Sequence, residues 1–385
     1  MMSRHIPLSV PSIHGNEWKY VKDCLDSGWV SSVGAYVDSF ERSLVDYTGS
    51  PYAVATASGT AALHVSLLAS GIRSGDEVIV PTLTFVATAN AVRYCGAEPV
   101  FMDCDRDTLC IDVEKINAFL EGSAYIDDNG VTFNRISKRP IRAIIPVHLF
   151  GHPSDMEALN ETARRYNLFV IEDATESLGS EYMGKKTGSF GKAGCFSFNG
   201  NKIITTGGGG MVVTDNEGLS KKIRHLTTQA RSDSIEYDHD EIGFNYRLTN
   251  VQAAIGVAQM EKIGEFIHIK RKNAELYRDL LAGQNEARLF WEHDGGKSNF
   301  WYITIKVPGS HKMPLMEYLQ SREIQTRPIW KPLHTLPMYR DYTAYDISNA
   351  LEAYDTCMNL PCSIDIREED IEFVVKSVMH YFNKS

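Results

Sequence analysis

The sequence predicts an α/β fold, in which a mixed, mostly parallel sheet is layered with helices. The first observation is a series of short, near-continuous apolar runs, which suit strands buried on both faces. The second is that helical patterns separate several of these runs. The third is a change of pattern after residue 250. We therefore expect a large α/β domain over residues 1–254 and a smaller C-terminal α+β domain over residues 255–385.

The predicted strands share an apolar, β-branched composition. They lie at residues 52–56, 77–81, 98–103, 142–147, 168–173, 194–198 and 209–214. Helices are predicted between them at residues 60–70, 87–96 and 154–167. The last of these helices is expected to begin with Ser154 as its N-cap, because Glu157 stands at capping-box spacing. The polar segment 123–140 is expected to form an inserted hairpin or loop.

The C-terminal part has longer helical patterns. Residues 249–282 predict one long helix, with a break near Gly264 as the alternative. The elements expected after it are a strand at 301–307, a helix at 314–321, a proline-rich stretch at 327–337 and a last helix at 367–383.

Composition excludes several classes of protein. The 385 residues carry a net charge of −10, which disfavours a nucleic-acid binder. The seven cysteines form no C-x-x-C pair, and their odd number argues against a disulfide framework. No apolar run has the length of a signal peptide's core or of a membrane span. We expect a cytoplasmic protein with no membrane or nucleic-acid partner and no metal site.

The segment FSFNGNKIITTGGGG (196–210) places Lys202 before four consecutive glycines. A phosphate loop needs its glycines before the lysine, and a dinucleotide fingerprint would lead into a helix, so both are disfavoured. A surface turn with a solvated lysine remains an alternative. Two phenylalanines and two isoleucines lie close to the lysine, however. Such surroundings lower the pKa of an amine and favour a reactive lysine.

Three further motifs fall where predicted strands end. Ser58-Gly59-Thr60 opens a helix, which suits either phosphate binding or an ordinary serine cap. Asp173 ends the strand at 168–173, at the edge where ligands bind in α/β sheets, although it could also be a helix N-cap. His148 follows another strand at the same edge, as a catalytic or a structural histidine.

One cofactor accounts for these signals together. Pyridoxal phosphate needs a lysine for its aldehyde, a carboxylate for its pyridine nitrogen, and a helix N-terminus with hydroxyl groups for its phosphate. Lys202, Asp173 and the turn at 58–60 supply these groups. We therefore expect an enzyme that uses pyridoxal phosphate.

The chain resembles the DegT/DnrJ/StrS sugar aminotransferases, which are pyridoxal phosphate enzymes of fold type I, with an aspartate aminotransferase-like fold. The resemblance runs nearly from end to end. The motifs that carry it are SGTAALH (58–64), GDEVIVPTLTFVATANAV (75–92), PVHLFG (146–151), EDATESLGS (172–180), SFNGNKIITTGGGGM (197–211), GFNYRLTNVQAAIG (243–256) and RPIWKPLH (327–334).

The resemblance implies roles around the cofactor ring. Lys202 would bond to the aldehyde and later shuttle a proton, and Asp173 would pair with the pyridinium nitrogen. Phe85 would stack on the ring, and His148 would lie near it. Glu176 stands where many members have a glutamine close to the ring hydroxyl.

The resemblance also implies how the phosphate is held. Gly59, Thr60 and Ser197 would contact it, and Asn245 would reach it from the other subunit of a homodimer with shared active sites. Many members have a glutamate where this chain has Gly208, which we interpret as a subfamily difference and not as lost activity.

The segment LDSGWVSSVGAYVDSFE (25–41) resembles enzymes that aminate C4 of a nucleotide-linked 4-keto-6-deoxyhexose, with an ordinary loop as the alternative. Residues 82–103 and 123–140 are most similar to enzymes of bacillosamine and legionaminic acid synthesis. The resemblance implies UDP-2-acetamido-2,6-dideoxy-4-hexulose as acceptor and glutamate as amino donor. The residues implied on the sugar-nucleotide side are Trp29, Ser31, Ser32, Arg327, Trp330 and His334.

Other functions remain open at this point. They are a sugar 3-aminotransferase, a pyridoxal phosphate lyase acting on an amino acid, and a regulator that binds the cofactor as a sensor. A lyase would need an arginine for the substrate carboxylate, and the sequence singles none out. A regulator is disfavoured by the acidic charge and by the lack of an appended helix-turn-helix. Some relatives dehydrate sugars with a histidine at the lysine position, so Lys202 favours transamination.

Overall fold

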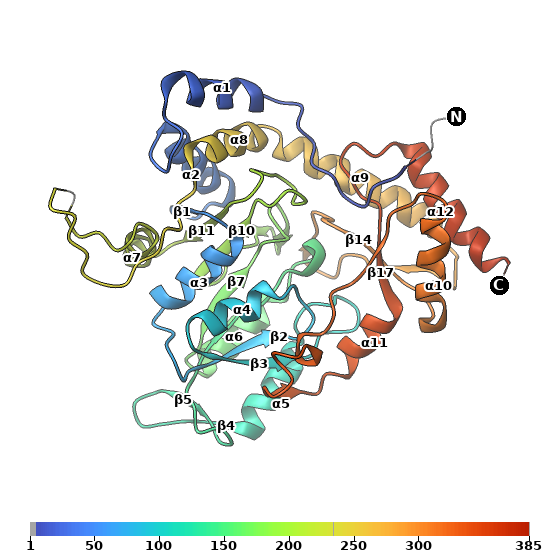
Figure 1. The fold of residues 1–385 in the computed structure, drawn as a ribbon. Helices are drawn as coiled ribbons and strands as arrows, with labels where there is room; N and C mark the ends of the chain where they lie inside the picture. Colours follow the sequence, from blue (N-terminus) through green and yellow to red (C-terminus); the bar gives the residue numbers. More distant parts are fainter. Residues whose placement is uncertain (1–4, 234, 385) are drawn as a thin grey trace.

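The computed structural model describes residues 5–233 and 235–384, and its centre is an eight-stranded mixed sheet (Figure 1). All neighbouring strands run parallel except β11, which is antiparallel to β1 and β10. In spatial order the strands are β1 (Tyr52–Thr56), β11 (Gly210–Thr214), β10 (Ala193–Ser197), β7 (Phe169–Asp173), β6 (Ile141–Ile144), β2 (Glu77–Pro81), β3 (Glu98–Met102) and β16 (Ala344–Tyr345). The seven strands predicted for the large domain are confirmed.

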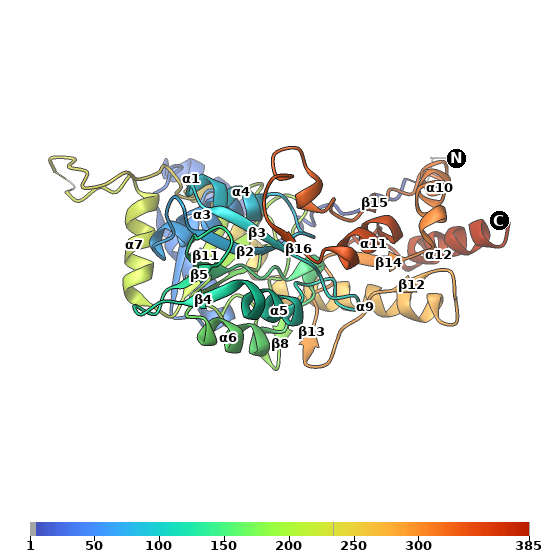
Figure 2. The same cartoon turned by 90° about the horizontal axis from the view of Figure 1, so that it is seen from below.

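Helices cover both faces of this sheet, as its continuously apolar strands require. Figure 2 shows α3 and α4 on one face and α5 and α6 on the opposite face. Two separate clusters of buried apolar side chains fill these layers. The helices around the sheet are α1 (Glu17–Ser27), α2 (Ala35–Thr48), α3 (Gly59–Ala69), α4 (Ala87–Tyr94), α5 (Val113–Ser123), α6 (Met156–Arg165) and α7 (Glu217–Thr227).

The long helix predicted at 249–282 is broken, in agreement with the alternative. Thr249 caps α8 in a capping box, and the chain turns at residues 261–262 before α9 begins. A four-stranded antiparallel sheet and three more helices follow. The elements of this part are α8 (Asn250–Met260), α9 (Ile263–Leu281), β12 (Arg288–Leu289), β14 (Ile303–Lys306), α10 (Gly309–Gln320), β15 (Arg327–Pro328), α11 (Ser348–Thr356), β17 (Cys357–Leu360) and α12 (Glu368–Phe382).

The structure also contains several short strands and turns outside the two main sheets. The hairpin expected within 123–140 is confirmed, because β4 and β5 pair antiparallel there. The short elements are β4 (Ala124–Ile126), β5 (Thr132–Asn134), β8 (Glu181–Tyr182), β9 (Lys185–Lys186), β13 (Gly296–Lys297) and the 3₁₀ turns at Leu149–Gly151 and Leu333–Thr335.

The predicted cap of α6 is wrong by one residue. Asp155 is the N-cap, and its carboxylate accepts a hydrogen bond from the backbone N–H of Ala158 at 3.0 Å. Ser154 is fully buried and serves a different purpose, since its N–H donates to Nδ1 of His148 at 3.0 Å.

Two segments cross the domain boundary predicted at 254/255. Near the N-terminus, Ile6 pairs with Ile324 of the C-terminal part. In the opposite direction, β16 adds an edge strand to the large sheet beside β3. The division into two domains therefore stays a prediction, because each part contributes a short paired segment to the other.

Among the residues that the structure describes, no helix combines the length and the apolar character that crossing a membrane demands.

Candidate active site

A cavity of about 480 Å³ opens where β1, β2, β7 and β10 end. The carboxyl edge of an open α/β sheet is the usual place for a ligand, because loops and helix N-termini converge there. The predicted site residues that line this cavity are Gly59, Thr60, Phe85, Asp173, Glu176, Ser197, Lys202, Arg327 and Trp330.

The N-terminus of α3 forms one wall of the cavity. Ser58 caps the helix, since its Oγ accepts a hydrogen bond from the N–H of Ala61 at 3.0 Å. A Cβ atom at Gly59 would lie only 2.8 Å from Cβ of Ser197 and 3.0 Å from Cγ2 of Thr175, so only glycine allows this close approach. The first N–H groups of a helix lack intrahelical partners, so this wall suits an anion such as a phosphate.

Asp173 presents its carboxylate to the cavity from the end of β7. Oδ2 accepts a hydrogen bond from Oγ1 of Thr88 at 2.7 Å, and Oδ1 accepts one from the N–H of Thr175 at 3.2 Å. Residues 174–180 form turns and not a helix, which rules out the N-cap alternative. A carboxylate fixed in this way can accept a charge-assisted hydrogen bond from a protonated ring nitrogen.

Lys202 extends from the loop between β10 and β11. It borders the open cavity, yet the surrounding protein desolvates its amine and lowers its pKa, against the attraction of Glu176 and Asp173. Its Nζ lies 3.9 Å from the centre of the indole ring of Trp301. This position supports the expectation of a partly desolvated lysine and disfavours the alternative of a solvated lysine on a surface turn.

Glu176 is a second carboxyl group in the cavity. Its Oε2 accepts a hydrogen bond from the N–H of Phe150 at 2.7 Å. Burial raises the pKa of Glu176 to about 7, against the opposing effect of Lys202. The indole Nε1 of Trp330 lies close enough to act on this carboxyl group, but it is buried without a hydrogen-bond partner of good geometry among the described residues.

His148 does not line the cavity. It is fully buried, and its Nδ1 accepts a hydrogen bond from Ser154, so the ring proton resides on Nε2 and is donated to Oε2 of Glu172 at 3.0 Å. Glu172 also accepts from the N–H groups of three residues between 188 and 191. Because both ring nitrogens are engaged, this arrangement supports a structural histidine and gives no support to the predicted catalytic role.

Five other predicted residues lie outside the cavity of this chain. Trp29 is 58% exposed, and Ser31 and Ser32 follow it in the loop between α1 and α2. Asn245 is exposed as well. The imidazole of His334 is hydrogen-bonded through Nδ1 to Oγ1 of Thr82 at 2.6 Å and holds the segment after β15 against the large sheet.

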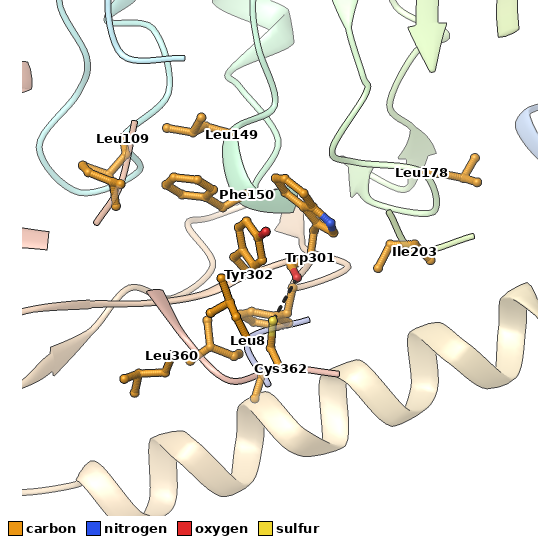
Figure 3. Close-up of a cluster of buried hydrophobic side chains, with 14 of the residues drawn as sticks. Leu8, Leu109, Leu149, Phe150, Leu178, Ile203, Trp301, Tyr302, Leu360 and Cys362 are labelled. Carbon is orange, nitrogen blue, oxygen red and sulfur yellow. Dashed lines mark hydrogen bonds between the residues drawn. The ribbon is translucent and has the colours of Figure 1, made fainter. Parts of the chain in front are cut away.

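The sequence analysis missed several residues of the cavity, and Thr88 and Trp301 are the two that bear most on its chemistry. Thr88 lies in the motif TFVATANAV, and its place one turn after Phe85 was the available signal. Trp301 carries no such signal, because it is 99 positions from Lys202 and reads as the start of an ordinary strand. Figure 3 shows Trp301 and Tyr302 within a cluster of buried apolar side chains that also contains Phe150 and Ile203.

The residues present fit pyridoxal phosphate. The close approach at Gly59 leaves the N-terminus of α3 bare for a phosphate, and Asp173 and Lys202 stand across the same cavity. Phe85 is 50% exposed at the cavity and packs on Trp330 with ring centres 5.2 Å apart, so its free face can receive a planar ring. The fold and the site together define a pyridoxal phosphate enzyme of fold type I.

The chain belongs to the DegT/DnrJ/EryC1/StrS aminotransferase family, whose model matches residues 11–379. It is 40% identical to a GDP-perosamine synthase of Escherichia coli O157:H7, over 99% of both chains. It is also 36% identical to EpsN of Bacillus subtilis, which is named as a pyridoxal phosphate-dependent aminotransferase, over 99% of this chain and 97% of that one. The predicted family, enzyme class and cofactor are confirmed.

Solved structures agree with this assignment. A DegT DnrJ EryC1 StrS aminotransferase from Brucella abortus has a TM-score of 0.88 and 27% identity, with 95% of each chain covered. PseC of Helicobacter pylori, an aminotransferase of pseudoaminic acid biosynthesis, has a TM-score of 0.89 and 25% identity over 99% of this chain and 100% of that one. The predicted fold class is therefore confirmed as well.

Proposed function

We propose that this chain transfers an amino group from glutamate to C4 of a nucleotide-linked 4-keto-6-deoxyhexose. The observation that carries the proposal is the single cavity in which the N-terminus of α3, Asp173 and Lys202 meet. These are the three anchor points that pyridoxal phosphate requires.

The cofactor would supply the electron sink that lets an amino group leave one carbon and join another. The protein's part is to bind, orient and move protons. Asp173 would hold the charge of the ring nitrogen, and Phe85 and the α3 turn would fix the ring and the phosphate. Lys202, with its lowered pKa, would take a proton from the donor carbon and return it as a general acid–base group.

The sugar nucleotide would enter beside Arg327 and Trp330, which line the same cavity. Arg327 offers a charge for either a diphosphate or the carboxylate of glutamate. Gly208 leaves room here, because a Cβ atom at that position would meet only Nε2 of Gln252, at 3.5 Å. The cavity is open at the position where many relatives carry a glutamate.

The relatives favour a different nucleotide from the one that the sequence resemblance implied. Three of them, with 38–40% identity, are named GDP-perosamine synthase, a name that specifies a GDP-linked amino sugar. We therefore propose a GDP-linked keto sugar as the first acceptor to test, ahead of UDP-2-acetamido-2,6-dideoxy-4-hexulose.

The active enzyme is proposed to be a homodimer with shared sites. Exposed apolar side chains gather on α1 and the loop after it, where Trp18 is 83% and Val33 is 67% exposed, which suits an interface. Asn245 lies outside the cavity of its own chain, so its proposed contact with the phosphate would be made by Asn245 of the partner subunit. Trp29 of the partner subunit, with the serines at positions 31 and 32 of the same loop, would likewise approach the sugar.

A spectroscopic cycle tests the proposal. The purified enzyme with pyridoxal phosphate should show a visible absorption band that glutamate bleaches. Addition of a GDP-linked 4-keto-6-deoxyhexose should restore the band and yield an amino sugar by mass spectrometry. A panel that also contains UDP-linked and 3-keto sugars separates the nucleotide and the position of amination. A band that glutamate does not bleach, or that no keto sugar restores, contradicts the proposal.

A further inference from the structure

The indole ring of Trp301 is the nearest partner of the Lys202 amine. The amine lies 3.9 Å from the ring centre, well within the reach of a cation–π interaction. Over residues 5–233 and 235–384, no carboxylate forms a salt bridge with it, and Glu176 and Asp173 act on it only by attraction across the cavity. The π face is therefore the closest group that can stabilise the protonated amine.

The ring of Trp301 is held firmly. The residue is only 2% exposed. Its Nε1 donates to the backbone oxygen of Asn201 at 2.6 Å, and its N–H donates to Oδ1 of Asn299 at 2.8 Å. Its carbonyl oxygen accepts from Nζ of Lys270 at 2.8 Å and from Sγ of Cys362 at 3.3 Å, the second of which is drawn in Figure 3. A ring fixed at both ends can act as a template for a flexible lysine.

We propose that Trp301 is a positioning residue whose indole face receives the protonated amine of Lys202 whenever that amine is not covalently engaged. The inference rests on the proposed function, in which Lys202 must leave and rejoin the cofactor carbon during each cycle. A lysine side chain has four rotatable bonds, so an amine without a resting place would sample many positions. Docking it on a fixed ring keeps it within reach of the donor carbon.

The direction in which the pKa of Lys202 changes when Trp301 is replaced separates this role from simple packing. If Trp301 only excludes water, a smaller side chain admits water, eases the desolvation of the amine and raises its pKa. If the π face stabilises the ammonium ion, loss of that face lowers the pKa further. A cation–π contact of ordinary strength corresponds to roughly half a unit to one and a half units.

The test with the least disturbance replaces the tryptophans by fluorinated analogues in the full-length protein without added cofactor. Fluorination weakens the π face and hardly changes the ring's size. The pKa of Lys202 is read from the pH dependence of its modification by an amine-reactive reagent, quantified by mass spectrometry. The chain has five tryptophans, and among the described residues Trp291 is the other one with a cation over its ring. That cation is Arg278, which stays charged. The pKa of Lys202 should fall with each added fluorine, and an unchanged value overturns the proposal.

Three substitutions complete the test. Trp301→Leu should lower the pKa of Lys202 by roughly half a unit to one and a half units, and Trp301→Phe should lower it less. Trp291→Leu is the matched control, because Trp291 packs on Phe300 and should leave the value unchanged. In the holoenzyme, Trp301→Leu should reduce kcat with little change in KM and should shift the pH profile in the direction of the new pKa.

A raised pKa in Trp301→Leu overturns the proposal. The amine is titrated without cofactor, so this outcome is distinct from a failure of the protein to bind pyridoxal phosphate.

Discussion

Replacing Glu176 with glutamine should change how the stability of the protein depends on pH. The carboxyl group is buried and accepts a hydrogen bond from the N–H of Phe150. Burial raises its pKa from 4.5 to about 7 in the folded protein. Glutamine keeps the shape and the acceptor oxygen but has no proton to release, so it imitates the neutral form at every pH.

The sign and size follow from this pKa. Between pH 4.5 and pH 7 the unfolded chain releases the proton before the folded protein does, so the free energy of unfolding falls as pH rises. The favourable contribution is complete below pH 4.5 and lost above pH 7. This rise in the pKa of Glu176 corresponds to a change of about 3 kcal/mol in the free energy of unfolding. The variant Glu176→Gln lacks this loss and should therefore gain about 3 kcal/mol relative to the wild type between pH 4.5 and pH 7.5.

Denaturant unfolding at the two pH values measures the effect, at one fixed concentration of cofactor-free protein. The matched control is Glu157→Gln, which makes the same chemical change at an exposed position on α6, outside the cavity. If the stability difference between the wild type and Glu176→Gln is the same at both pH values, Glu176 is not held neutral by burial.

Three further predictions concern the cofactor and the subunit interface. Gly59→Ala should weaken pyridoxal phosphate binding by roughly ten- to a hundredfold, because the added methyl group overpacks the turn, and a fluorescence titration measures this. Thr88→Val should lower kcat by roughly ten- to a hundredfold, because it removes the hydroxyl donor of Asp173, and steady-state kinetics measures this. A mixture of Lys202→Ala and Asn245→Ala proteins, each nearly inactive alone, should recover roughly a quarter of the wild-type activity after subunit exchange if sites are shared.

Each of these predictions has a contrary outcome. Gly200→Ala is the control for Gly59→Ala, because no atom lies within 4 Å of the added methyl group, and equal affinity in the two variants would refute the close-packing argument. A wild-type kcat in Thr88→Val would show that the hydroxyl group does not position the carboxylate. A mixture that stays inactive, although size-exclusion chromatography shows dimers that exchange, would place each site within one subunit.

The strands and the core of the site could be predicted because both depend on local signals. Strands buried on two faces must be apolar throughout, so the runs are visible in the sequence. Asp173 is the last residue of such a strand, and Gly59 and Lys202 each follow one. Their convergence in one cavity follows because β1, β10 and β7 run in the same direction, although the antiparallel β11 lies between β1 and β10.

The partners of His148 and Lys202 could not be predicted, because they depend on tertiary packing. Neighbouring residues of a strand point to opposite faces, so Glu172 turns away from the cavity that Asp173 enters. Nothing local reveals that Glu172 binds His148 instead. Trp301 likewise contacts Lys202 from the C-terminal part. The two residues are far apart in the sequence and share no motif.

The central claim is that Lys202 is the residue that joins the cofactor. Incubation with pyridoxal phosphate, reduction with borohydride and peptide mapping by mass spectrometry would identify the modified lysine directly. We predict a phosphopyridoxyl group on the peptide that contains Lys202, and its loss in a folded Lys202→Ala variant that has no transaminase activity. A label on another lysine, or turnover by Lys202→Ala, would contradict the account.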